Sequence, residues 1–279
     1  MAAYYAWAQN LLPFQWAQYS FMLNALLAVF LVSPLFGILG TMVVNNKMAF
    51  FSDAIGHSAL TGIAIGVLLG MRDPLAAMLA FSVLLAIGIS LVKAHGKSSP
   101  DTVIGVFSST AVALGIVILS RGGGFARYSN FLIGDLLSIT VQEILMLLIV
   151  LIIVLLFWAR FFNQLLLVSV NPSLAGSRGI KVLYIEIIFS VIMAIVVTIS
   201  IQWVGILIIN SLLILPAAAA RNIAGNMRQY HVIAVLIAII SGLTGLILSY
   251  YWGTATGATI VLCASLFYVL TLWGYAKFN

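Results

Sequence analysis

The chain has 279 residues, of which 64% are hydrophobic and only 6% are charged. An ordinary soluble domain carries about 25% charged residues, so this composition excludes a soluble globular fold. Unbroken apolar runs such as Ile144 to Trp158 are also unlike the roughly ten-residue alternating segments of a transmembrane β-barrel. The sequence therefore predicts an all-α polytopic membrane protein, with one transmembrane domain over residues 1–279.

The formal net charge is +6, from 12 Lys and Arg against 6 Asp and Glu. In a membrane protein such an excess is typical of cytoplasmic loops, and it gives no reason to expect a nucleic-acid partner. The single cysteine, Cys263, excludes an intrachain disulfide and a thiolate metal cluster.

Hydropathy and Gly/Pro positions predict about nine transmembrane helices. The seventh is the shortest and contains Pro216, which removes a backbone donor. If this segment is re-entrant, eight helices cross the membrane. The predicted spans are Ser20 to Val44, Phe51 to Gly70, Pro74 to Ala94, Thr102 to Ser120, Leu136 to Ala159, Val182 to Ile201, Val204 to Ala219, Val232 to Tyr251 and Gly257 to Tyr275.

The connection Arg160 to Lys181 is predicted to be a cytoplasmic loop. With it inside, nine Lys and Arg residues lie in the cytoplasm and three outside. The positive-inside rule then predicts an external N-terminus and a cytoplasmic C-terminus. The nine inside are Lys47, Lys93, Lys97, Arg160, Arg178, Lys181, Arg221, Arg228 and Lys277, and the three outside are Arg72, Arg121 and Arg127.

Two connections between spans are long enough to have a role of their own. Arg121 to Asp135, with three successive glycines, is expected outside as an irregular loop or a re-entrant turn. In the cytoplasmic connection, Asn171 and Pro172 favour a helix start, and Gly179 favours its end. A short helix between two spans is a natural docking surface, although the same residues also suit a plain connector.

Asp53 and His57 are the ionisable pair expected inside a span. An Asp at a helix centre costs about 2.5–3.5 kcal/mol on insertion, so its presence calls for a role. The i, i+4 spacing puts both side chains on one helical face, where they offer oxygen and nitrogen to a divalent ion such as zinc, manganese or iron. The alternative is a buried Asp–His hydrogen bond that holds two helices together.

Two glutamates, Glu143 and Glu186, lie in or near spans without a His or carboxylate partner at helical spacing. We expect Glu186 to snorkel or to pair with a basic residue. Phosphate-loop, zinc-protease and nucleophile-elbow motifs are missing from the sequence, so nothing in it favours an enzyme.

Three ordered motifs resemble the integral membrane permeases of ABC importers for zinc, manganese and iron. The first, Met48 to Gly66, reads MAFFSDAIGHSALTGIAIG and contains the D-x-x-x-H pair. The second, Asn171 to Ala224, reads NPSLAGSRGIKVLYIEIIFSVIMAIVVTISIQWVGILIINSLLILPAAAARNIA, and Asn130 to Thr140 reads NFLIGDLLSIT. One departure is YYWGTATGATIV at Tyr250 to Val261, where such permeases often have Asp-x-Pro.

The resemblance implies an ABC type II importer-like permease in a bacterial cytoplasmic membrane, with the metal ion as cargo and no permanent cofactor. It implies a second permease copy, most simply in a homodimer, together with cytosolic ATPase subunits that hydrolyse ATP and an extracytoplasmic metal-binding protein. Asp53 and His57 then line the channel. The segment 171–180 becomes the coupling helix, with Ser173, Leu174, Ala175, Arg178 and Gly179 at the ATPase.

Two other function classes are compatible with the sequence. An ion-gradient-coupled secondary metal transporter often uses discontinuous helices, which a broken seventh span would provide. A structural scaffold would give Asp53 and His57 no task beyond packing.

Overall fold

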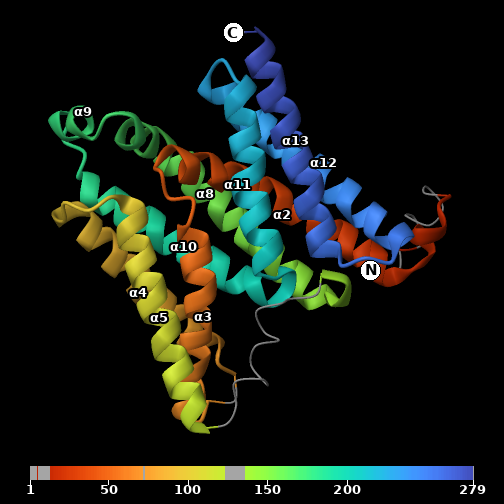
Figure 1. Ribbon diagram of the computed structural model, residues 1–279, viewed down its shortest axis with the longest axis horizontal. Coiled ribbons are helices and arrows are strands. Elements are labelled where there is room, and N and C mark those ends of the chain that lie inside the picture. Colours follow the sequence, from red (N-terminus) through yellow and green to blue (C-terminus); the bar gives the residue numbers. More distant parts are fainter. Residues whose placement is uncertain (1–4, 6–12, 72, 123–135, 279) are drawn as a thin grey trace. The chain divides into compact units, whose positions relative to one another are not determined.

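The computed structural model describes residue 5 and residues 13–71, 73–122 and 136–278. These residues form ten α-helices and two short 3-10 helices, and they contain no strand. The α-helices are α2 (Ser20–Asn45), α3 (Phe51–Leu68), α4 (Leu75–His95), α5 (Pro100–Gly122), α8 (Val141–Val170), α9 (Pro172–Ser177), α10 (Val182–Val204), α11 (Ile206–Ile223), α12 (Met227–Trp252) and α13 (Thr256–Phe278). The 3-10 helices are η1 (Gln15–Gln18) and η2 (Leu136–Ser138) (Figure 1).

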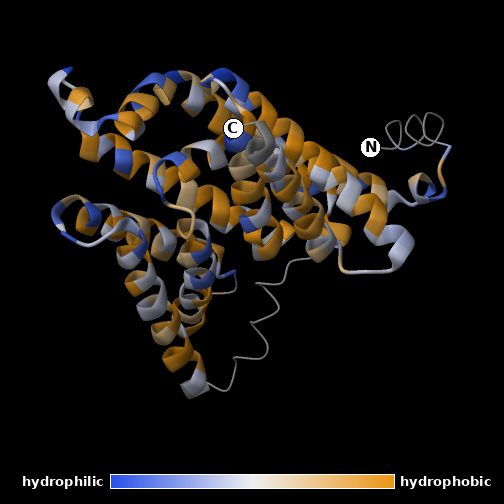
Figure 2. Cartoon of the chain, turned by 45° about the horizontal axis from the view of Figure 1, so that its top comes forward, coloured by the Kyte–Doolittle hydropathy of each residue, from blue (hydrophilic) through white to orange (hydrophobic). Residues whose placement is uncertain are grey.

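Each predicted span corresponds to a separate helix, which confirms the all-α membrane architecture. Among the described residues, eight helices are long and apolar enough to cross a membrane, and the apolar part of α11, Leu207–Ile223, is shorter. The helix α11 runs without interruption through Pro216. Gly205 alone separates it from α10, with a φ of 85° that residues with a side chain rarely adopt. Figure 2 shows hydrophobic residues along the helices and hydrophilic ones mainly near helix ends.

The predicted cytoplasmic loop Arg160 to Lys181 is mostly helical, which corrects the sequence interpretation. The helix α8 continues to Val170 and has 30 residues, a length of about 45 Å against about 30 Å of bilayer hydrocarbon. It begins at Val141 rather than at residue 136. The predicted loop on the other side of α8 falls largely on residues 123–135, which lie outside the described residues.

A reciprocal cap sets the start of α8. The backbone N–H of Thr140 donates to Glu143 Oε2 at 2.7 Å, and the N–H of Glu143 donates to Thr140 Oγ1 at 3.4 Å. This is a capping box, which satisfies backbone donors that the first turn leaves free. Glu143 therefore has a structural role at the start of α8, with a threonine as its partner rather than a His or a carboxylate.

The chain divides into two compact units, and it passes between them four times. One unit comprises Met1–Thr41, Asp135–Ile153 and Trp203–Asn279. In it α11, α12 and α13 pack on one another, and glycines of α2 approach α11 and α12 closely. The other unit comprises Met42–Gly134 and Val154–Gln202. The single-domain description of the whole chain stays a prediction.

In the second unit, α3 packs against both α4 and α5 (Figure 1). A Cβ atom at Gly62 would lie 2.5 Å from Met78 Cα on α4, and one at Gly115 of α5 would lie 2.5 Å from Thr61 Oγ1. The Thr61 hydroxyl donates a hydrogen bond to the Ala111 carbonyl. Small residues and this hydrogen bond hold α3 tightly, as expected for helices packed inside a membrane.

Candidate functional site

The Asp53–His57 pair lies on the first two turns of α3. The contact joins His57 Nε2 and Asp53 Oδ1 at 3.4 Å, and the two side chains are 47% and 45% exposed, respectively. Apart from these two, all residues from Phe51 to Ala64 are buried. The pair is therefore the open part of an otherwise enclosed helical stretch.

This geometry does not match the second interpretation of the pair, a buried hydrogen bond that holds two helices together. A buried hydrogen bond between two helices would require buried partners on different helices, whereas this contact joins half-exposed residues of one helix. Asp53 also lies in the first turn of α3, where the helix dipole favours a carboxylate. The position near a helix end, rather than at mid-helix, lowers the cost of placing these groups in a membrane span.

The separation of the two donor atoms fits joint binding of a divalent cation. Two ligands at about 2.1 Å from a tetrahedral zinc ion lie about 3.4 Å apart, which is the distance between His57 Nε2 and Asp53 Oδ1. Within the described part of the chain, no group of three or more His, Cys, Asp or Glu residues is placed to hold a metal ion. One copy of this chain thus offers two candidate ligand atoms here, one oxygen and one nitrogen.

The short helix α9 begins and ends as the sequence predicts. The N–H of Leu174 donates to Asn171 Oδ1 at 3.0 Å, and Pro172 occupies the first helical position. Gly179 has a φ of 79°, its N–H donates to the Gly176 carbonyl at 3.0 Å, and the N–H of Ile180 donates to the Ala175 carbonyl at 3.1 Å. These two bonds form a Schellman end, which explains the need for glycine at position 179.

The two apolar residues of α9 point in different directions, and this alters the expected docking surface. The side chain of Ala175 is fully buried within the chain, whereas Leu174 is 42% exposed. Ser173, Arg178 and Gly179 are also exposed. Ala175 therefore anchors α9 to its own protein, and Leu174 is the apolar residue available to a partner.

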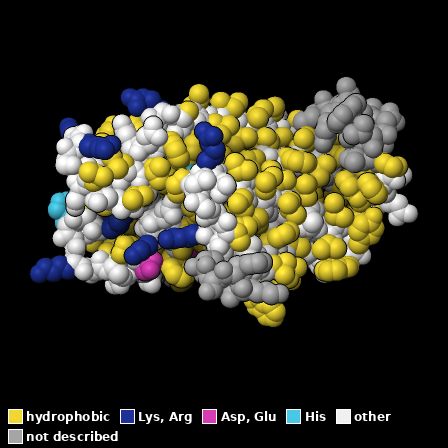
Figure 3. All heavy atoms as spheres, turned by 90° about the horizontal axis from the view of Figure 1, so that it is seen from above, with side chains coloured by type: hydrophobic (Ala, Val, Ile, Leu, Met, Phe, Trp, Pro, Cys, Tyr) yellow, Lys and Arg dark blue, Asp and Glu magenta, His cyan; other side chains and the backbone are white. Residues whose placement is uncertain are grey.

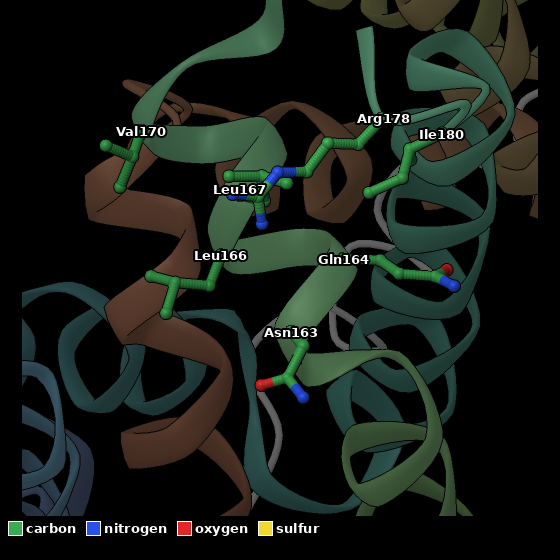
Figure 4. A pocket seen from close by; sticks show the side chains of 7 residues that line it. All are labelled: Asn163, Gln164, Leu166, Leu167, Val170, Arg178 and Ile180. Atoms are coloured by element: carbon green, nitrogen blue, oxygen red, sulfur yellow. The ribbon is translucent and has the colours of Figure 1, made fainter. Parts of the chain in front are cut away.

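Beside α9 lies a cavity of about 500 Å³ with mixed chemistry. Figure 4 shows Arg178 and Ile180 reaching from the segment after α9 toward side chains of the α8 end. The α8 residues that line it are Asn163, Gln164, Leu166, Leu167 and Val170. The cavity combines an arginine, two amides and aliphatic side chains next to the predicted coupling helix.

The structure gives Glu186 a basic partner, as the sequence suggested, but from a distant segment. Lys93 Nζ lies 3.2 Å from Glu186 Oε1, and the two side chains are only 17% and 20% exposed. The sequence alone did not link these residues, which are 93 positions apart. The available signal was their opposite charge at predicted cytoplasmic ends of the third and sixth spans.

The rest of the surface agrees with a membrane protein that carries excess positive charge. Figure 3 shows hydrophobic side chains over much of one face, with Lys and Arg side chains more numerous there than Asp and Glu. The exposed apolar residues include Leu84, Val106, Leu156 and Trp273. Such exposure is costly in water and normal in a bilayer.

Comparison with known proteins shows similarity over nearly the whole chain. The profile of the ABC 3 transport family matches residues 18–275. The high-affinity zinc uptake system membrane protein ZnuB of Haemophilus influenzae is 34% identical over 260 residues, which cover 91% of this chain and 98% of that protein. The manganese transport system membrane protein MntC of Listeria monocytogenes is 30% identical over 253 residues, which cover 91% and 90%. The solved structure of PsaBC from Streptococcus pneumoniae in complex with Fab matches with a TM-score of 0.78 and 28% identity, covering 97% of this chain and 95% of that one.

Proposed function

Because the chain belongs to the ABC 3 transport family, we propose that it is the permease subunit of an ATP-driven importer of a divalent transition metal: zinc, manganese or iron. The observation that carries the proposal is the half-exposed Asp53–His57 pair on the buried helix α3. The names of the similar ZnuB and MntC proteins refer to zinc and manganese. Borderline divalent ions of this kind accept both carboxylate and imidazole ligands.

Two ligand atoms per chain support a site that a second copy of the chain completes. If two copies are related by a two-fold axis along the pathway, each contributes one Asp53 and one His57 around that axis. Two carboxylates and two imidazoles then replace much of the hydration shell of the ion. A conducting site must also release its cargo, so we expect weak or incomplete coordination rather than a closed structural cage.

In this proposal α9 is the coupling helix, and it docks on a separate cytosolic ATPase. Leu174 offers an exposed apolar contact, and Ser173 and Arg178 surround it with hydrogen-bond donors. Arg178 suits an acidic surface on the ATPase. The ATPase hydrolyses ATP, and an extracytoplasmic metal-binding protein delivers the ion.

A cytoplasmic α9 also sets the direction of the other helices. If all nine apolar helices cross a bacterial cytoplasmic membrane, alternation puts the N-terminus outside and the C-terminus inside, as the positive-inside rule favours. The beginning of α3 then lies toward the cytoplasm, on the same side as α9. The Asp53–His57 pair would be the inner part of the pathway, close to the machinery that opens it.

Uptake by the reconstituted complex tests the function. We expect proteoliposomes with the permease and its ATPase to import Zn²⁺, Mn²⁺ or Fe²⁺ only with ATP. The Asp53→Ala, His57→Ala double variant should import at least about tenfold more slowly, since loss of even an outer-shell partner costs about 10–100-fold. Asp101→Ala, which removes an exposed carboxylate from the first turn of α5, is the matched control. Uptake driven by a proton or sodium gradient without ATP would instead establish a secondary transporter. The continuous α11 offers no broken helix in support of that alternative.

Copurification tests the docking surface separately. Leu174→Asp places a charge on the exposed face of α9, so we expect it to weaken ATPase binding while the permease stays folded. Ile223→Asp is the control, because Ile223 is an exposed apolar residue, at 50%, on another helix end. Full ATPase recovery with Leu174→Asp would contradict a coupling role for α9.

A further inference from the structure

The buried ion pair between Lys93 and Glu186 lies where several helix ends of one unit meet. Lys93 is in the last turn of α4, and Glu186 is in the second turn of α10. Lys93 Nζ also lies 4.0 Å from the sulfur of Met48, just before α3. A cavity of about 10 Å³, roughly the space of one water molecule, adjoins the pair. The cavity lining is Asn46, Met48, Lys93, Leu165, Val168, Ile185, Glu186 and Phe189.

The elements around this cavity connect α9 with the Asp53–His57 pair. Leu165 and Val168 belong to α8, which enters α9, and Glu186 belongs to α10, which leaves it. On the other side, Met48 precedes Asp53 by five residues, and α4 packs along α3. Residues of α8 and α10, the helices on either side of α9, therefore lie with Lys93 of α4 and Met48, just before α3, around one small cavity beside the ion pair.

Stability alone does not explain a charged pair at this place. Removing two charges from water is costly, and well-packed apolar residues often replace such a pair without loss of stability. Lys93 is well placed for its own helix, since it lies in the last turn of α4, where the dipole favours a positive charge, whereas Glu186 lies beyond the first turn of α10 and gains little from that dipole. What an ion pair adds is a directional link between two helices, α4 and α10.

We propose that Lys93 and Glu186 form a latch that transmits the movement of α9 to the base of α3, and so to Asp53 and His57. The latch rests on the proposed function, because it gives α9 the coupling role and α3 the metal site. Lys93 and Glu186 are positioning residues, since they act through the helices rather than on the ion. ATPase-driven displacement of α9 pulls α10, and the ion pair carries that displacement to α4 and Met48.

The test measures metal imported per ATP hydrolysed by the reconstituted complex, with Zn²⁺, Mn²⁺ and Fe²⁺ as probes. Lys93→Glu and Glu186→Lys each place like charges together, and we expect each to lower this ratio roughly tenfold, within the range for changes along a coupling network. The Lys93→Glu, Glu186→Lys double variant restores opposite charges, and we expect it to recover most of the ratio. The apolar pair Lys93→Met, Glu186→Leu avoids a lone buried charge, so it should assemble normally and still show the low ratio.

The outcomes separate the latch from a packing role and from the proposed function itself. If the apolar pair assembles with the ATPase and keeps the wild-type ratio, Lys93 and Glu186 only pack helices, and the latch is wrong even though the transport function stands. A charge-swapped double variant that is no better coupled than the single variants also overturns it. A wild-type complex that hydrolyses ATP but imports none of Zn²⁺, Mn²⁺ and Fe²⁺ would overturn the proposed function, and the latch with it.

Discussion

Two acid–base pairs in the same unit have nearly equal contact distances but differ in burial. His57 and Asp53 are 3.4 Å apart on one helix, and about half of each side chain is exposed. Lys93 and Glu186 are 3.2 Å apart on two helices, and about four-fifths of each side chain is buried. Distance therefore says little about what each pair does.

Burial and helix membership separate the two pairs. An exposed i, i+4 pair contributes about 0.3–0.5 kcal/mol, so water or a cation can replace its contact at little cost. A buried pair that loses one partner leaves a charge without compensation, at a cost of about 3–5 kcal/mol. The first pair is suited to exchange ligands, and the second is suited to hold helices in register.

The largest expected effect is the loss of protein stability when the buried Lys93–Glu186 pair loses one partner. Lys93→Met leaves Glu186 charged and mostly buried, so we expect a loss of about 3 kcal/mol in the free energy of unfolding. The apparent Tm of the purified protein measures it. The double variant Lys93→Met, Glu186→Leu should regain most of that loss, and a double variant as unstable as the single one would contradict this account.

The packed side of α3 offers the next test. A Cβ at Gly62 would lie 2.5 Å from Met78 Cα, whereas one at Gly105 of α5 meets no atom within 4 Å. We expect Gly62→Ala to destabilise the protein by about 1–3 kcal/mol through overpacking, and Gly105→Ala to stabilise it by about 0.5–1 kcal/mol through helix propensity. Opposite shifts of the apparent Tm would establish that α3 packs tightly against α4 at Gly62. Equal shifts would refute this tight packing.

A smaller, local effect is expected at the cap of α9. Asn171→Ala removes the acceptor for the Leu174 N–H, at a cost of about 1 kcal/mol. Faster hydrogen exchange of the α9 amides should reveal this, with little change in the apparent Tm. Ser177→Ala is the control, because its hydroxyl only donates to a carbonyl of the same helix; it should leave exchange nearly unchanged.

The smallest change is predicted for the pair with the proposed transport role. Asp53→Ala and His57→Ala should each alter the free energy of unfolding by about 0.5 kcal/mol or less, because the contact is exposed and lies within one helix. Thermal unfolding of these variants and of Lys93→Met under the same conditions measures the difference in stability directly. A loss as large as that of Lys93→Met would mean that the two pairs have the same structural role.

Much of this fold follows from hydropathy, because every long helix here is an apolar run. Hydropathy did not predict helix ends that lie outside an apolar run. The helix α8 continues past Arg160 to Val170, since Arg, Asn and Gln are good or acceptable helix residues outside the hydrocarbon. The start and end of α9 were predictable because Asn171, Pro172 and Gly179 act within a few residues of the chain.

The candidate site likewise includes contacts that the sequence predicts and contacts that it does not. The Asp53–His57 contact was predictable because helical spacing fixes it. The Lys93–Glu186 contact was not, since it depends on how α4 and α10 pack. Likewise, a six-residue helix has too short a pattern to show that Ala175 faces inward while Leu174 faces outward.

The unbroken length of α8 has a mechanical consequence. Its 30 residues form a rod about 45 Å long, with one end in each compact unit and α9 following directly at Asn171. A tilt of about 10° around its midpoint moves the end that carries α9 by about 4 Å, since half the rod is about 22 Å. A helix of this length would act as a lever arm, turning a small rotation in the bilayer into a stroke of roughly three-quarters of a helical turn at the surface.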